Sequence, residues 1–312
     1  MSHSRRSFLK QSLLTGAGLT IYNSTLARAL YPQEDLVKLT ILYTNDWHSR
    51  IEPWAKDDPK HPNMGGAARR ATAIKTLRKK EKNILLLDAG DIFQGTPYFN
   101  FFGGELEYKI MSEMGYEATT IGNHDFDNGL NGLLKQMPHA KFDFLTANYD
   151  FSNTIIAGKT RPYKIFTKDH LKIGVFGLGV ELNGLVPPML CEGVQYLDPL
   201  EKAAEMAYLL KVEQKCDYII CLSHLGYSYP DKKVSDIVLA KESKNIDLII
   251  GGHTHTYLEK PTIMRNREGK TVWITQMGWA GLYLGQIDLF FTRDKKQLLT
   301  SDASALKLVN DV

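Results

Sequence analysis

Short apolar segments alternate with amphipathic segments after residue 30, and this alternation restricts the fold more than any other feature of the sequence. Segments 36–43 and 84–87 are rich in Leu, Ile and Val, which predicts buried strands. Segments 65–82 and 105–114 place apolar residues three or four positions apart, which predicts helices with one buried face. Strands that alternate with helices form sheets covered by helices, so the pattern predicts an α/β fold.

The alternation continues through the second half of the chain. Asp198-Pro199 marks the start of a helix, because an N-cap residue precedes a proline at the first helical position. Segments 218–222 and 246–250 predict two further strands, and the helix between them is expected to begin near Pro230. The last long segment, 271–291, is predicted to be rich in β-structure.

The composition is that of a globular protein with a large core. The chain has 312 residues, of which 43% are hydrophobic, and a chain of this length buries about 75% of the surface that it exposes when unfolded. Three cysteines are too few for a disulfide framework, and Cys216 and Cys221 are predicted to be buried free thiols. No repeat or Pro/Ser-rich linker interrupts the sequence, so residues 30–312 are predicted to form a single domain.

The first 29 residues have the features of an export signal. Ser4-Arg5-Arg6-Ser7-Phe8-Leu9-Lys10 matches the twin-arginine pattern, and Ala27-Arg28-Ala29 supplies a small-x-small cleavage pattern. Residues 1–29 are therefore predicted to be a twin-arginine signal peptide, which would place the mature chain in the periplasm or otherwise outside the cytoplasm. Without the four cations of this segment the formal charge of +3 becomes −1, so no binding of a nucleic-acid polymer is expected.

Polar residues that suit metal binding follow five predicted strands, namely the four at 36–43, 84–87, 218–222 and 246–250 and a further short strand that ends at Ile121. Because the carboxyl ends of strands converge on the ligand-binding crevice of an α/β sheet, these residues are expected to meet. One residue separates Asp46 from His48, and one separates His253 from His255, so on extended backbone each pair lies on one face. The five motifs are Asn45-Asp46-Trp47-His48, Asp88-Ala89-Gly90-Asp91, Gly122-Asn123-His124-Asp125, Ser223-His224 and Gly251-Gly252-His253-Thr254-His255.

The ligands that these motifs offer indicate a pair of divalent cations. They are carboxylates, imidazoles and an amide, without a thiolate, and this set suits Mn²⁺, Zn²⁺ or Fe. Any one of the histidines, taken alone, would be interpreted as a hydrogen-bonded core residue. Five histidines directly after buried strands favour a shared site instead. Seven ligand candidates are too many for one tetrahedral ion and suit two ions with a bridging carboxylate.

The order of the motifs carries a family resemblance. D-x-H, G-D, G-N-H-D, S-H and G-G-H-x-H, in this order, are similar to the motifs of the calcineurin-like metallophosphoesterase superfamily. More narrowly, residues 43–48, 90–95 and 122–127 resemble the N-terminal catalytic domain of the bacterial 5′-nucleotidase / 2′,3′-cyclic phosphodiesterase / UDP-sugar hydrolase family. The resemblance covers nearly all of residues 36–291, and it implies two packed mixed β-sheets flanked by helices.

The resemblance also implies roles for single residues. His124 is expected to be the catalytic histidine, and Asp127 is expected to orient it. From the residues alone, Asp127 could also be the N-cap of a helix over residues 129–137, and the two roles are compatible; Asp125 is interpreted as a structural acid. Two ions about 3.5–4 Å apart can hold a hydroxide that attacks phosphorus, while the histidine stabilises the transition state or the leaving group. The expected ligands are Asp46, His48 and His255 for one metal and Asn123, His224 and His253 for the other, with Asp91 as the bridge.

Two departures from related patterns narrow the interpretation. Residue 94 is Gln where the purple acid phosphatases have a metal-binding Tyr, so that branch is disfavoured. The sequence also ends at Val312 without the C-terminal domain with which 5′-nucleotidases bind the nucleoside. We therefore expect either weak discrimination among bases or a separate subunit that resembles this domain.

The predicted function is that of an exported, dinuclear metal-dependent phosphoester hydrolase of the 5′-nucleotidase type. The expected substrates are nucleotides, cyclic nucleotides or nucleotide-sugar diphosphates. Two alternatives stay open: a general phosphomonoesterase or sulfur-ester hydrolase, and a non-catalytic metal-binding partner subunit. His124 argues against the second, because a protein that only binds gains little from an acid–base histidine. No membrane span is expected, since the apolar part of the signal is too short.

Overall fold

The computed structural model describes residues 31–309, so the predicted signal peptide lies outside the described residues. The strands of the first sheet are β1 (Leu36–Thr44), β2 (Ile84–Asp88), β3 (Ala118–Thr119), β4 (Asp143–Phe144), β13 (Tyr283–Thr292) and β14 (Leu298–Lys307). The strands of the second are β6 (Tyr163–Lys168), β7 (Leu171–Leu178), β9 (Tyr218–Ser223), β10 (Leu248–Gly251), β11 (Thr262–Arg265) and β12 (Thr271–Thr275). A short pair, β5 (Tyr149–Asp150) and β8 (Gln195–Tyr196), stands apart.

Both sheets are mixed, with a parallel centre. The order of the first is β14-β13-β1-β2-β3-β4, and the order of the second is β11-β12-β10-β9-β7-β6. Strands β1 to β4 run parallel, as do β7, β9, β10 and β12, while β13, β14, β6 and β11 are antiparallel to their neighbours. The carboxyl ends of the parallel strands therefore face one edge of each sheet, which is where the polar motifs begin.

Alternate residues of β1 explain how the sheets pack. Leu39 and Ile41 join the apolar cluster between the two sheets, whereas Leu42 joins the cluster beneath the helices on the outer face. The Tyr43 hydroxyl lies 2.5 Å from that of Thr275, which ties β1 to β12 across the two sheets. A strand buried on both faces needs apolar residues at nearly every position, which is why the predicted strands read as continuous apolar runs.

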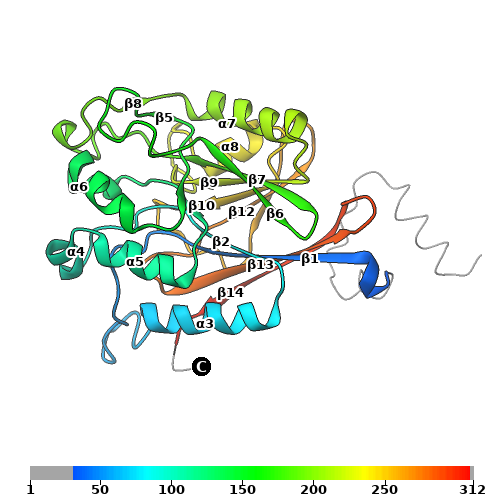
Figure 1. Cartoon of the computed structure of the whole chain (residues 1–312), viewed down its shortest axis with the longest axis horizontal. Helices are drawn as coiled ribbons and strands as arrows, with labels where there is room; N and C mark the ends of the chain where they lie inside the picture. The colour runs from blue at the N-terminus through cyan, green and yellow to red at the C-terminus, as the bar shows by residue number, and fades with distance from the viewer. Residues whose placement is uncertain (1–30, 310–312) are drawn as a thin grey trace, which may run out of the picture.

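Helices cover the outer faces of both sheets (Figure 1). Those on the first sheet are α3 (Ala67–Lys80), α4 (Pro97–Phe102), α5 (Glu105–Met114) and α6 (Gly129–Gln136). Those on the second are α7 (Pro199–Tyr208) and α8 (Asp236–Glu242). Short helical turns lie at Gln33–Asp35, His124–Phe126, Met137–His139, Pro188–Leu190 and Leu209–Glu213. From residue 31 to residue 309, no helix is long and apolar enough to cross a membrane.

The structure confirms most of the predicted elements to within about two residues and moves the start of one helix further. Helix α5 has the predicted bounds, and Asp198 caps α7 by accepting hydrogen bonds from two backbone N–H groups. Cys216 and Cys221 are buried and free, as predicted. The helix expected near Pro230 begins later, at Asp236, because the Ser235 hydroxyl caps it there.

Seven strands have no counterpart in the sequence prediction, namely β4, β5, β6, β7, β8, β11 and β14. In β7 the strand signal is weakened by Gly174 and Gly177. A Cβ atom at Gly177 would lie 1.8 Å from the carbonyl oxygen of Leu145. The glycine is therefore required by the close approach of a second segment, which only the folded structure reveals.

Candidate metal centre

The polar residues after β1, β2, β3, β9 and β10 come together at the carboxyl edges of the two sheets. The backbone N–H of His253 donates to the Asp46 carboxylate at 3.0 Å, although 207 positions separate the two residues. The ring nitrogen Nδ1 of His224 lies 2.7 Å from the carbonyl oxygen of Ala89. The convergence expected from the five strand ends is therefore present, and it joins one sheet to the other.

The first group of possible metal ligands consists of Asp46, His48 and His255. The Nε2 atoms of the two histidines are 2.9 Å apart, and His255 Nε2 is 3.4 Å from Asp46 Oδ1. Asp46 and His48 are buried, whereas His255 is exposed. These are the three residues that the family resemblance implies for one of the two metals.

The second group consists of Asp91, His224 and His253, with Asn123 beside them. His224 Nε2 is 3.0 Å from Asp91 Oδ2, and His253 Nδ1 is 2.8 Å from Asn123 Oδ1. The same Asp91 oxygen is 3.9 Å from Nε2 of His48 in the first group. Asp91 therefore lies between the two groups, at the position that the resemblance implies for a bridging ligand.

The donor atoms fit divalent cations. His224 Nδ1 lies 2.7 Å from a backbone carbonyl oxygen, and His48 Nδ1 lies 3.2 Å from that of Phe93. An N–H that donates to a carbonyl leaves the lone pair of Nε2 directed into the site. When both rings are neutral, each group presents lone-pair atoms about 3 Å apart, an arrangement that a cation among them would stabilise.

The charges of the buried residues also favour the binding of cations. Asp46 and Asp91 are buried, and within residues 31–309 no Lys or Arg pairs with either carboxylate. Burial lowers the pKa of His224, but Asp91 and Asp46 raise it to about 10 overall. Burial and the nearby His224 lower the pKa of His253 to about 4, so this ring is neutral, the form that binds a metal. The pocket thus attracts positive charge between two acids while keeping His253 available as a ligand.

Five of the seven ligand candidates have left-handed backbone conformations. The φ angles are 49° for Asp46, 52° for His48, 54° for Asp91, 72° for His253 and 52° for His255. Such conformations are rare outside glycine, cost about 1–3 kcal/mol each and cluster at functional sites. The surrounding fold therefore holds these side chains in place against a local preference of the backbone.

His124 and Asp127 form a pair beside Asp91. His124 Nδ1 is 2.9 Å from Asp127 Oδ2, and this hydrogen bond raises the pKa of His124. The backbone N–H of His124 donates to Asp91 Oδ1 at 2.7 Å, and its ring centre lies 5.2 Å from that of His48. The alternative interpretation of Asp127 as a helix N-cap is wrong, because Asn128 occupies that position before α6.

Asp125 organises the loops that carry the ligands. Its buried carboxylate accepts hydrogen bonds from four backbone N–H groups at 2.8 to 3.3 Å, those of Gly122, Asp91, Ile92 and Phe93. The carboxylate thus joins the loop after β2 to the loop after β3. This agrees with its interpretation as a structural acid.

Gln276 is part of the site, and the sequence analysis gives it no role. Its side-chain amide donates to the carbonyl oxygen of Gly252 at 2.5 Å and accepts from the Thr254 hydroxyl and the Thr256 backbone N–H. The loop that carries His253 and His255 is therefore bound at both ends by one buried side chain. Gln276 directly follows β12, a parallel neighbour of β10, so the rule of polar residues at strand ends would have found it.

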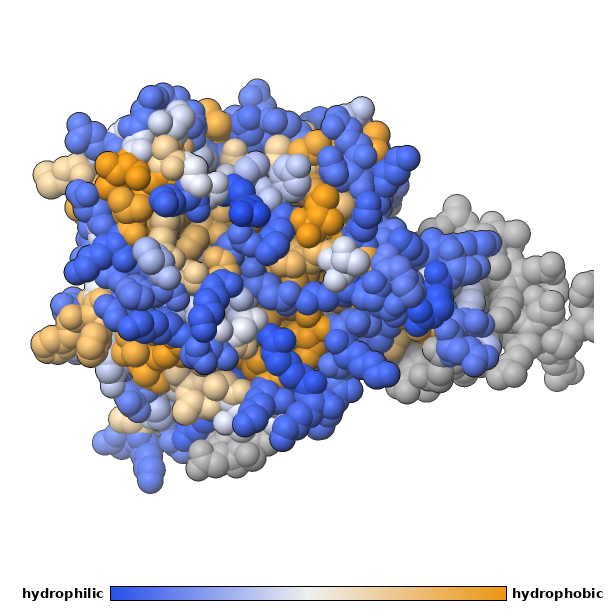
Figure 2. Space-filling model, viewed as in Figure 1, coloured by the Kyte–Doolittle hydropathy of each residue, from blue (hydrophilic) through white to orange (hydrophobic). Residues whose placement is uncertain are grey.

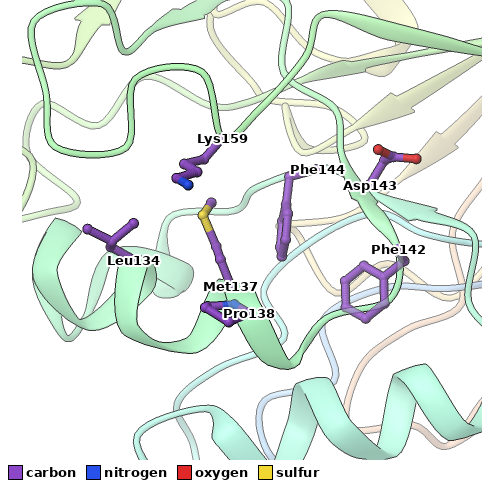
Figure 3. A pocket seen from close by; sticks show the side chains of 7 residues that line it. All are labelled: Leu134, Met137, Pro138, Phe142, Asp143, Phe144 and Lys159. Atoms are coloured by element: carbon purple, nitrogen blue, oxygen red, sulfur yellow. The ribbon is translucent and has the colours of Figure 1, made fainter.

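A hollow of about 360 Å³ next to α6 is separate from this centre (Figure 3). Phe144, Met137 and Lys159 point into it, and Asp143 points away. Asp143 is paired with Lys164 and Arg161. None of the ligand candidates lines the hollow.

Comparisons with known proteins agree with the fold and the motifs. The chain is 35% identical over 297 residues to the snake venom 5′-nucleotidase of Crotalus adamanteus, covering 88% of this chain and 49% of that protein. The 5′-nucleotidase precursor of Thermus thermophilus superimposes with a TM-score of 0.78 at 32% identity, covering 87% of this chain and 55% of that one. The NAD nucleotidase of Haemophilus influenzae superimposes with a TM-score of 0.76 at 31% identity, covering 88% of this chain and 56% of that one.

The chain spans about half the length of these relatives. The structural matches bear out the predicted fold of two mixed sheets flanked by helices. A model of the calcineurin-like phosphoesterase family matches residues 39–257, which include every ligand candidate and the His124–Asp127 pair. The chain therefore belongs to the calcineurin-like phosphoesterases.

Proposed function

We propose that this chain is a dinuclear metal-dependent phosphoester hydrolase of the 5′-nucleotidase type. The observation that supports this most is the position of Asp91, whose carboxylate lies within 3.9 Å of a histidine nitrogen in each ligand group. Nucleotides are the proposed substrates, because the three relatives described above, each matching at least 87% of this chain, are named as nucleotidases.

In this proposal the two groups of residues hold two divalent cations. Asp46, His48 and His255 would bind one cation, and Asn123, His224 and His253 the other, with Asp91 in contact with both. When bound, the cations supply activation of water and stabilisation of charge on the phosphoryl oxygens. Mn²⁺, Zn²⁺ and Fe²⁺ all suit this set of nitrogen and oxygen ligands.

His124 is the proposed catalytic residue. Its Nδ1 is engaged by Asp127, which leaves Nε2 to donate to a phosphate oxygen or to the leaving group. Asp127 acts as its positioning residue, because its hydrogen bond fixes the tautomer and the plane of the ring. A side chain 38% exposed can reach a substrate above the metal ligands.

We also propose that a separate polypeptide over the site contributes the recognition of the nucleoside. The metal ligands and His124 recognise phosphate only. Phe101 and Met189, each 81% exposed, lie on segments next to the His124–Asp127 pair. The segments that carry Phe101 and Met189 contact the two residues that follow Asp127. The carbonyl oxygen of Gly103 accepts a hydrogen bond from the Asn128 side chain, and Leu190 packs on Gly129. Exposed apolar side chains beside a site suit contact with a partner.

A substrate panel tests the proposal. The purified chain is reconstituted with Mn²⁺, Zn²⁺ or Fe²⁺ and assayed on adenosine and guanosine monophosphates, ribose 5-phosphate, a cyclic nucleotide, a nucleotide-sugar and an organic thiosulfate. We expect metal-dependent release of phosphate, with kcat/KM for the three monoesters within about tenfold of one another, since one aromatic stack contributes about 0.5–1.5 kcal/mol. Hydrolysis of the thiosulfate alone would contradict the proposed activity. Micromolar affinity for adenosine monophosphate with rejection of ribose 5-phosphate would contradict the need for a partner.

We also propose export through the twin-arginine pathway, which the Arg5-Arg6 pair supports. Replacing both with Lys should leave unprocessed precursor in the cytoplasm, because the pathway reads this pair. Fractionation and immunoblotting measure the outcome. Arg28→Lys, the same substitution outside the pair, serves as the control and should be exported normally. Normal delivery of the double variant would count against this route.

A further inference from the structure

A long groove separates α3 from α5 on the outer face of the first sheet. The two helices lie side by side, and apolar surface bordered by hydrophilic surface is visible between them (Figures 1 and 2). The groove has a volume of about 920 Å³, within the range of sites that hold small molecules. Its apolar lining includes Ile51, Ala67, Ala71, Ile74, Ile110 and Met114.

Positive charge is concentrated on one part of this groove. Lys75, Arg78 and Lys79 line it from the C-terminal half of α3, a helix with six basic residues and no acidic one. In the described part of the chain neither Lys75 nor Lys79 has an ion-pair or hydrogen-bond partner. Arg78 donates only to the carbonyl oxygen of Gly115, at 2.8 Å, so its charge is uncompensated.

The α5 side of the groove is electrically balanced. Lys109 Nζ forms an ion pair with Glu105 Oε1 at 2.5 Å, and Lys141 Nζ forms one with Glu113 Oε1 at 3.0 Å. The part of α3 before Lys75 contributes only Ala67, Ala68, Ala71 and Ile74 to the lining, and none of these carries charge. The groove is therefore apolar along its length and cationic at one end.

We propose that this groove binds a single-chain anionic amphiphile, with its hydrocarbon chain between α3 and α5 and its headgroup beside Lys75, Arg78 and Lys79. Contact with Ile74, Ile110 and Met114 removes the chain from water. A long-chain carboxylate matches this pattern, because it carries one charge at one end. An acidic amphipathic helix matches less well, since it would present charge along both edges, including the balanced α5 side.

The site is distinct from the proposed metal centre. None of the seven metal-ligand candidates, His124 or Asp127 lines the groove. Changes in its lining should therefore leave hydrolysis of p-nitrophenyl phosphate unchanged. That assay also reports whether a variant is folded, so failure of this proposal and failure of the proposed phosphoesterase activity can be told apart.

Fluorescence titration of the purified chain with 11-(dansylamino)undecanoic acid tests the proposal. We expect saturable binding at one site per chain and displacement by palmitate but not by its methyl ester. Ala71→Trp fills the groove and should abolish the binding. The double variant Lys75→Glu/Lys79→Glu should weaken it about tenfold, as expected for the loss of two exposed charge contacts. The matched control Lys80→Glu/Lys82→Glu changes the same charge near the end of α3, outside the groove lining, and should bind within about twofold of the parent chain.

Three results would overturn the proposal. The first is the absence of saturable binding, and the second is undiminished binding by both Ala71→Trp and the Lys75/Lys79 variant. The third is a preference for a membrane surface. In that case, vesicles of phosphatidylglycerol would bind the parent chain while free palmitate did not displace the probe, and both double variants would lose vesicle binding equally.

Discussion

Asp91→Asn is expected to abolish metal occupancy and turnover together. Asp91 is the carboxylate that lies between the two ligand groups. Its Oδ2 atom is 3.0 Å from His224 Nε2 and 3.9 Å from His48 Nε2. The amide oxygen of Asn can still accept the hydrogen bond from the His124 backbone N–H, so the substitution mainly removes charge. Losing a ligand common to two cations removes several kcal/mol of transition-state stabilisation, so kcat should fall by about 10³-fold or more. Elemental analysis and steady-state kinetics on the same preparation measure both effects.

Glu107→Gln is the matched control for this variant. Glu107 is also a fully buried acid, but it lies in α5 and belongs to neither ligand group. We expect it to retain two metals per chain. If Asp91→Asn keeps two metals and near-normal kcat, then Asp91 is not the bridge and the dinuclear proposal is wrong.

His124→Ala is expected to separate chemistry from metal binding. The side chain belongs to neither ligand group, so both metals should remain. The loss of a positioned acid–base group should lower kcat by about 10²–10⁴-fold. The loss should be smaller for p-nitrophenyl phosphate than for an alkyl phosphate, because nitrophenolate leaves without protonation. Metal content and kcat on both esters are the measurements.

Two further variants sharpen this test. Asp127→Asn should keep both metals and lower kcat less than His124→Ala, because it disturbs only the orientation of the ring. His139→Ala removes a half-exposed imidazole outside the centre and should leave kcat unchanged. An equal loss for the alkyl and nitrophenyl esters in His124→Ala would exclude a general-acid role and leave stabilisation of charge.

Local sequence determined the elements whose causes are local. Continuous apolar runs predicted β1 and β2 because a strand buried on both faces needs apolar residues throughout. Asp198 and the following proline predicted the start of α7 because capping depends on neighbours in the chain. The position of polar residues directly after strands predicted the candidate centre. This prediction needed no knowledge of distant contacts, because parallel strands of one sheet place their carboxyl ends along the same edge.

Tertiary structure alone decided how these residues meet. The Nε2 atoms of His48 and His255 lie 2.9 Å apart although 207 positions separate the two residues in the sequence. No rule of sequence spacing specifies such a pair. The left-handed backbone at Asp46 and Asp91 is unfavourable locally and persists because distant segments hold it. Gln276 binds the histidine loop, and Gly177 admits Leu145, through contacts that appear only once the sheets have packed. The sequence therefore determined the chemical groups and the edge at which they lie. The packing of one sheet on the other decided their geometry, because that geometry depends on contacts between residues far apart in the chain.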